Sequence, residues 1–119
     1  MMRMSTALIV VAGVLSALPA AAQDQAPELT VPQNRAAKLA GLAGFVNMSC
    51  PEIQTEKDRF RTAIEALRIN PADLEHGKMR LSAESYIMAY QKDVPASCRQ
   101  AGELFGRNGS VIPGLFVSR

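Results

Sequence analysis

Two cysteines constrain the fold of this chain more than any other feature. Cys50 and Cys98 are the only cysteines among the 119 residues, and 48 positions separate them. Outside the reducing cytoplasm two cysteines normally pair, and here a single intramolecular pairing exists. In the chain-entropy description, closing a loop of this length stabilises the folded state by about 4 kcal/mol, which is a large share of the stability of a small domain.

The first residues indicate that the chain leaves the cytoplasm. An arginine precedes a mostly apolar run from Ala7 to Leu18, and after a proline Ala20–Ala22 supply the small residues that a signal peptidase needs. This order is typical of a secretory signal peptide, which we expect to cover residues 1–22. The apolar run is shorter than the roughly 20 residues that cross a bilayer, so we expect cleavage and no stable membrane insertion. The protein is therefore expected to be periplasmic or secreted, with its two cysteines joined.

The composition bounds the size of the exported protein and its partners. The 97 residues that follow position 22 suffice for one small domain. Without the arginine of the signal peptide, 12 basic side chains remain against 11 acidic ones, and the charges are interspersed. This balance lacks the basic face that nucleic-acid binding requires, and it gives no strong attraction to an anionic membrane. We expect neither nucleic acid nor a membrane as a partner.

Apolar residues at helical spacing recur along the exported chain. Residues 23–34 are polar, contain two prolines and are expected to form an extended N-terminal arm. Residues 35–119 are expected to form a single helical domain whose apolar C-terminal tail is punctuated by glycine and proline. Since no strand pattern is present, the expected fold is all-α, a small bundle of four to five short helices joined by one disulfide. The expected helices cover residues 35–49, 51–68, 71–76, 83–92 and 94–105.

Capping residues set the expected starts of these helices. Ser49 is followed three residues later by Glu52, which fits a capping box at the start of the second helix. Asn70, which precedes a proline, is expected to cap the third helix. Ser82 and Asp93 precede the last two helices and are expected to cap them in the same way.

Two sets of residues are candidates for a surface that binds a partner. The tail after Gly106 is too apolar for a free disordered end, so it either packs back onto the bundle or meets a partner. Its proline and glycines argue against a regular strand. Tyr86 and Tyr90, one helical turn apart, either stack in the core with their hydroxyls at the surface or extend the same patch. The predicted functional or dimer surface consists of Tyr86, Tyr90, Val111, Ile112, Leu115, Phe116 and Val117.

The titratable residues do not form a catalytic or metal-binding set. A free catalytic thiol needs a base beside it, and the sole histidine is His76. Together with Asp73, His76 is able to bind a metal or act as a weak acid–base pair, but a solvated short helix explains both residues better. Glu52 and Glu56 share a predicted helix face, where the helix dipole explains acidic residues in a first turn. We therefore expect no enzyme, with no catalytic residue, no metal ligand and no cofactor.

The layout of the chain is similar to two families of small periplasmic proteins. The signal peptide, the short helices and the spacing of Cys50 and Cys98 resemble acid-stress chaperones of the HdeA type. The size, the compartment and a cysteine at the start of a late helix, in the segment SCRQAGELF, resemble helical immunity proteins that block secreted cell-wall amidases. The first resemblance implies that acid exposes apolar surface to protect client proteins. The second implies inhibition of one partner protein.

The function expected from these observations is binding of another protein by an exported, non-enzymatic inhibitor or immunity-like module. A homodimer is left open, and the identity of the partner is not specified by the sequence. The alternative function is that of a periplasmic acid-stress chaperone of the HdeA type. Suppression of client aggregation at about pH 3 favours the chaperone, whereas one dominant partner that copurifies at neutral pH favours the binding module.

Overall fold

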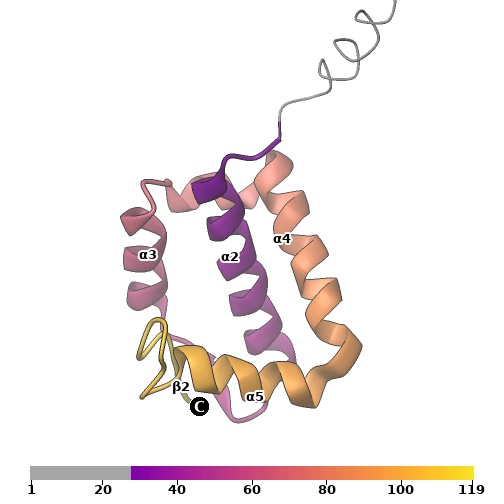
Figure 1. Ribbon diagram of the computed structural model, residues 1–119, viewed down its shortest axis with the longest axis vertical. Helices are drawn as coiled ribbons and strands as arrows, with labels where there is room; N and C mark the ends of the chain where they lie inside the picture. The colour runs from indigo at the N-terminus through magenta and orange to yellow at the C-terminus, as the bar shows by residue number, and fades with distance from the viewer. Residues whose placement is uncertain (1–27) are drawn as a thin grey trace, which may run out of the picture.

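The computed structural model describes residues 28–119 of the chain (Figure 1). The predicted signal peptide, residues 1–22, and the first part of the predicted arm lie outside the described residues. Among residues 28–119, no helix is both long enough and apolar enough to cross a membrane. The elements in chain order are helix α2 (Val31–Ser49), strand β1 (Ile53–Thr55), helix α3 (Lys57–Ala66), 3-10 helix η2 (Pro71–Glu75), helix α4 (Gly77–Tyr90), 3-10 helix η3 (Gln91–Asp93), helix α5 (Val94–Phe105) and strand β2 (Phe116–Ser118).

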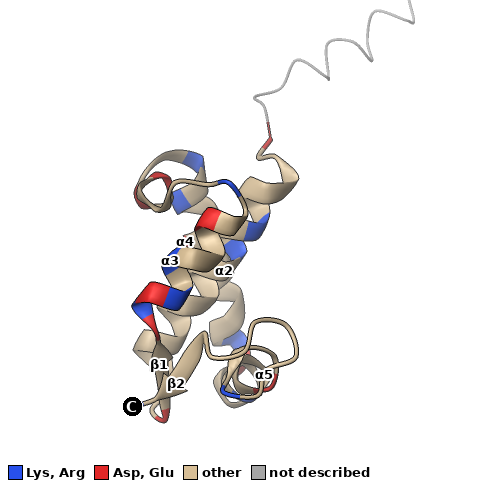
Figure 2. Ribbon diagram, turned by 90° about the vertical axis from the view of Figure 1, so that its left-hand side faces the viewer, with Lys and Arg blue, Asp and Glu red and all other residues tan. Residues whose placement is uncertain are grey.

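The expectation of a mainly helical domain with one disulfide is confirmed, and the structure adds a small two-stranded sheet that was not expected (Figure 2). β1 and β2 form an antiparallel pair in which Ile53 lies opposite Ser118 and Thr55 lies opposite Phe116. The proline and glycines of the tail precede β2 and form the turns that bring it back to β1. The expected bundle of four to five short helices is formed only in part. Three helices, α2, α3 and α4, stand side by side, and α5 crosses their lower ends (Figure 1).

Helix α2 begins inside the segment that was expected to be an extended arm. Thr30 and Gln33 form a reciprocal capping box: the Gln33 amide donates to Thr30 Oγ1 at 3.2 Å, and the Thr30 amide donates to Gln33 Oε1 at 2.8 Å. The proline between them occupies the first turn, where its missing N–H costs no hydrogen bond. Residues 31–34 are therefore helical.

The second predicted helix starts later than expected. Ser49 is the last residue of α2 rather than a cap, and Glu52 lies in the turn that follows. The chain then extends as β1, and α3 begins only after Glu56, whose carboxylate accepts a hydrogen bond from the Arg59 amide at 2.8 Å. The Glu56 amide donates to the Leu115 carbonyl at 2.8 Å. Pairing with the distant tail therefore holds this segment extended, which no local pattern indicates.

The remaining caps are partly as predicted. Asn70 accepts a hydrogen bond from the Ala72 amide at 3.0 Å, and Asp93 accepts one from the Ala96 amide at 3.1 Å. Both expected caps are confirmed. Ser82, however, lies inside α4, which begins at residue 77.

The closest helix pair is formed by α2 and α4, which run in the same direction (Figure 1). A Cβ built on Gly41 would lie only 2.7 Å from both the Ala83 carbonyl oxygen and Tyr86 Cβ. One turn further along, the fully buried ring of Phe45 lies 5.8 Å from the ring of Tyr90, measured between centroids. Glycine weakens α2 as an isolated helix, but at this position it allows the backbone of α4 to come close.

The predicted disulfide joins the end of α2 to α5. The Cα atoms of Cys50 and Cys98 are 5.6 Å apart, and Cys50 is buried. Beside it, the Arg119 guanidinium donates to three carbonyls at the C-terminal end of α2, those of Val46, Asn47 and Cys50, at 3.3, 2.7 and 3.1 Å. A cation at this end of a helix is favourable, because the last carbonyls lack partners within the helix. The C-terminal end of α2 is thus tied both to α5 and to the end of the chain after β2.

Candidate functional site

The structure divides the predicted partner surface into two parts. Leu115 and Phe116 are 0% and 1% exposed, and the Phe116 ring meets Phe105 of α5 edge-on, with 5.9 Å between centroids. Val117 is half-buried in β2, where it pairs with Gln54 of β1. Leu115 and Phe116 complete the protein's own core, because the tail folds back onto the helices. Their assignment to a partner surface is therefore corrected.

The other predicted surface residues lie in two different places. Tyr86 packs between α4 and α2: its hydroxyl donates to Asn34 Oδ1 at 3.2 Å, and its ring stacks on Tyr90 with 6.5 Å between centroids. Burial, and to a lesser extent the neighbouring Tyr86, raises the pKa of Tyr90. Tyr90, the half-buried Ile112 and the exposed Val111 line a groove on the surface of the domain.

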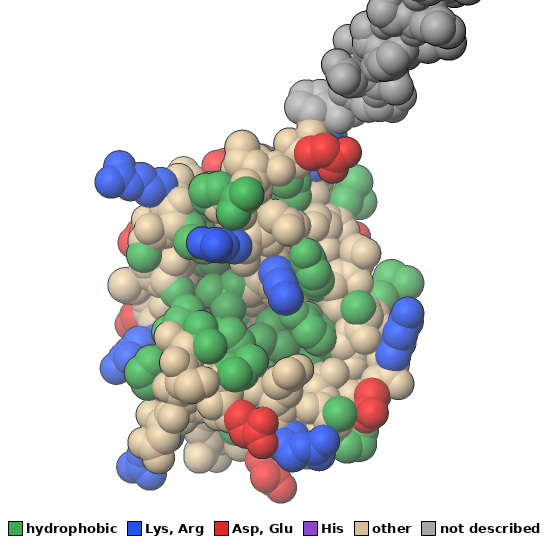
Figure 3. Space-filling view, in the orientation of Figure 1, with side chains coloured by type: hydrophobic (Ala, Val, Ile, Leu, Met, Phe, Trp, Pro, Cys, Tyr) green, Lys and Arg blue, Asp and Glu red, His purple; other side chains and the backbone are tan. Residues whose placement is uncertain are grey.

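This groove has a volume of about 1100 Å³. It lies between α2, α3, α5 and the tail, and we call it the α2–α3–α5 groove. Leu39 and Leu42 of α2 form its floor. Ala63 of α3 and Leu67, the residue that follows the helix, form one wall. In the space-filling view, apolar side chains gather at the centre of the face that α2, α3 and α5 surround (Figure 3).

The second wall comes from α5 and the tail. Ala101, Leu104 and Phe105 follow one another at helical spacing, and Val111 and Ile112 continue the apolar surface beyond the end of the helix. Val111 is 58% exposed, and Leu104 and Phe105 are half-buried. The fold therefore leaves a continuous apolar surface open rather than burying it.

Helices α3 and α5 each carry an apolar face of which only part packs into the core; the rest of the face lines the groove. On α3, Ile64 is fully buried, whereas its neighbours Ala63 and Leu67 are only half-buried. On α5, Ala101 is buried and Leu104 is half-buried. Only three groove residues, Tyr90, Val111 and Ile112, were predicted from the sequence, because the apolar positions of each helix also fit a single core-facing stripe. The width of the apolar faces on α3 and α5 is the sequence feature that could have indicated the other groove residues.

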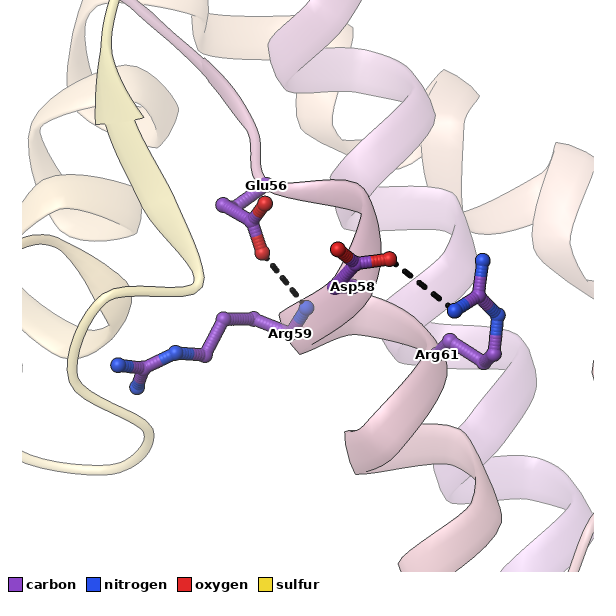
Figure 4. A network of polar contacts seen from close by, with 4 residues as sticks. All are labelled: Glu56, Asp58, Arg59 and Arg61. Atoms are coloured by element: carbon purple, nitrogen blue, oxygen red, sulfur yellow. Dashed lines mark hydrogen bonds and ion pairs between the residues drawn. The ribbon is translucent and has the colours of Figure 1, made fainter.

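At the lower end of the groove, two acidic and two basic side chains are engaged with one another or with the backbone. Figure 4 shows Glu56, Asp58, Arg59 and Arg61 at the start of α3. Asp58 and Arg61 form an ion pair at 3.0 Å, and the carboxylate of Glu56 caps the helix. The Arg59 guanidinium points away toward the tail and donates to the Pro113 carbonyl oxygen at 2.9 Å. The charges at this end of the groove are therefore balanced.

At the opposite end, two basic side chains of α2 lack acidic partners. Arg35 and Lys38 line the groove near the start of the helix, and both are exposed. Among the described residues neither side chain forms an ion pair or a hydrogen bond; Lys38 Nζ lies 6.0 Å from the centroid of the Tyr86 ring. The α2–α3–α5 groove thus combines an apolar interior with one positively charged end.

The residues that were considered as catalytic or metal-binding candidates lie apart from one another. His76 is exposed and precedes α4 without capping it, and Asp73 is exposed on η2. Glu52 and Glu56 do not share a helix face, because one lies in a turn and the other caps α3. In the part of the chain that the structure describes, no three His, Cys, Asp or Glu side chains cluster as a metal site would require. The hydroxyl of Ser97, inside the groove, donates to a backbone carbonyl oxygen at 2.9 Å.

The fold and the groove define a small, mainly helical, disulfide-linked domain with an open apolar groove. The chain matches no protein-family model, no curated protein and no solved structure.

Proposed function

We propose that this protein is an exported, non-enzymatic module that binds another protein through the α2–α3–α5 groove. The observation that carries the proposal is the open apolar groove, whose floor and walls come from three helices and the tail. Exposed apolar surface of this kind is costly in water and is typical of protein interaction sites. The groove holds no nucleophile beside a base, and its one serine hydroxyl is engaged with the backbone.

Export is supported by two independent features. The first residues follow the pattern of a secretory signal peptide. The link between Cys50 and Cys98 is of a kind that persists in oxidising compartments and is rare in the cytosol. The periplasm, or the space outside the cell, is therefore the proposed site of action.

A preformed groove favours an inhibitor or immunity-like binder over an acid-stress chaperone. A chaperone that exposes apolar surface by unfolding in acid does not need an open groove in its folded state. A binder that recognises one partner at neutral pH does need one, because a preorganised surface avoids the entropy of ordering flexible loops. The open groove of the folded domain supports the second mode of action.

Site-specific photo-crosslinking in the native host tests this proposal. A photoreactive residue replaces either Val111, which is 58% exposed in the groove, or Met88, which is 68% exposed on α4 and does not line the groove. We expect one dominant adduct with another protein from position 111 and none from position 88. Equal adducts from both positions, or none from position 111, would contradict groove binding. Suppression of client aggregation by the purified protein at about pH 3, with no adduct at neutral pH, would favour the chaperone instead.

A further inference from the structure

The distribution of charge around the α2–α3–α5 groove specifies the chemistry of its occupant. At the lower end Asp58 is paired with Arg61 and the Glu56 carboxylate accepts a backbone amide, so that end requires no charged partner. At the upper end Arg35 and Lys38 carry two positive charges that no carboxylate in the described residues neutralises. An occupant that is apolar along its length and acidic at one end complements this surface.

The open shape of the groove favours a helix over a small ligand. Sites for small molecules surround most of the ligand. This groove, with a volume of about 1100 Å³, lies open along one face of the domain (Figure 3). It extends along α2 from Arg35 to Leu42, and from Asp58 in α3 to Leu67 just after that helix, which at about 1.5 Å per residue corresponds to roughly 10–14 Å. That length matches about two turns of a bound helix.

We propose that the α2–α3–α5 groove binds an amphipathic helix of the partner protein, with the acidic end of that helix at Arg35 and Lys38. This proposal rests on the proposed function and specifies its partner. Two turns present apolar side chains at positions i, i+3 or i+4, and i+7, which enter the groove between Leu42, Ala63 and Leu104. Acidic side chains at one end of the helix then pair with the two basic residues.

Designed helical peptides test the charge requirement directly. One peptide, 16 residues long and held helical by a side-chain link, carries leucines at the three anchor positions and two glutamates at one end. Its matched control carries two lysines in place of the glutamates. Binding of each fluorescent peptide to the disulfide-bonded protein, residues 23–119, is measured by anisotropy. We expect the acidic peptide to bind at least about tenfold more tightly than the basic one, and its affinity to fall as salt is raised.

Charge reversal on the protein provides the second half of the test. The double variant Arg35→Glu and Lys38→Glu is expected to reverse the preference, so that the basic peptide binds more tightly. The control, Lys92→Glu and Arg107→Glu, makes the same change in net charge at exposed positions outside the groove and is expected to retain the original preference. Because all four residues are exposed, we expect the helical content of each variant to match that of the unmodified protein.

The outcomes separate this inference from the proposed function. Equal affinity for the two peptides, or a preference unchanged by R35E/K38E, overturns the acidic helix. So does binding of decanoate in the groove when neither peptide binds, since that result assigns the site to a small anionic amphiphile. If crosslinking from position 111 still captures one protein in any of these cases, groove binding stands and only the acidic helix is wrong. If the peptides behave as expected but no partner is captured, the groove's specificity stands and the proposed cellular function fails.

Discussion

At the scale of single residues, the packing of α2 against α4 depends on the absence of a side chain at Gly41. The site leaves no room for a methyl group, because a Cβ there would lie 2.7 Å from a backbone oxygen that cannot move independently of α4. In contrast, a Cβ on Gly102, which lies in α5, meets nothing within 4 Å. The two glycines occupy the interiors of helices but have opposite roles.

This contrast gives a matched pair of substitutions. Gly41→Ala is expected to lower the free energy of unfolding by about 1–3 kcal/mol, since α2 and α4 must separate to accept the methyl group. Gly102→Ala is expected to raise it by up to about 1 kcal/mol, because alanine favours the helix and no clash opposes it. Urea unfolding followed by circular dichroism measures both. An unchanged midpoint for Gly41→Ala would show that the two helices are not in close contact.

At the scale of elements, the parts that could be predicted from the sequence are those that local chemistry determines. Asn70 and Asp93 cap their helices as expected because a cap needs only the next few residues. Serine is also a preferred N-cap residue, yet Ser49 lies at the end of α2 and Ser82 lies inside α4. A capping residue type is thus a weak indicator: Glu56 caps α3 in place of Ser49, and α4 begins at residue 77 without a side-chain cap.

The parts that could not be predicted depend on contacts between distant segments. β1 and β2 contribute three residues each and are about sixty positions apart, so neither shows an alternating pattern long enough to recognise. The groove also depends on contacts between distant segments, because its floor and walls come from helices that are far apart in the sequence. Tyr90, Val111 and Ile112 were predicted as surface residues and do line it, whereas Leu115 and Phe116 were assigned to the same surface and are buried.

Truncation of two tail residues distinguishes the core from the groove. Phe116→Ala is expected to lower the free energy of unfolding by about 3–5 kcal/mol, because it leaves a cavity where the ring is 1% exposed beside Phe105. Val111→Ala is expected to change it by less than about 0.5 kcal/mol, because that side chain is 58% exposed. Chemical denaturation measures both values. Similar small changes for the two variants would show that the tail does not pack on the helices.

At the scale of the whole molecule, the disulfide joins two of the elements that form the α2–α3–α5 groove. The disulfide joins the end of α2, which provides the floor of the groove, to α5, which provides one wall. The link therefore contributes to stability and also fixes two sides of the α2–α3–α5 groove relative to each other. A domain of about one hundred residues that leaves part of its apolar surface open has a limited core, so a crosslink of this kind has a large effect on its stability.

Replacement of both cysteines by alanine, Cys50→Ala with Cys98→Ala, tests this connection. We expect a loss of about 4 kcal/mol in the free energy of unfolding, because the unfolded chain regains the freedom of a 48-residue loop. We also expect the acidic helical peptide to bind more weakly to the folded fraction, since α5 is no longer held against the end of α2. Met79→Ala is the control, because Met79 is buried on α4 and does not line the groove. Its truncation is expected to lower the free energy of unfolding by about 2–5 kcal/mol without lowering the affinity for the peptide. If peptide affinity, corrected for the folded fraction, falls equally in both variants, the crosslink acts on stability alone and does not shape the groove.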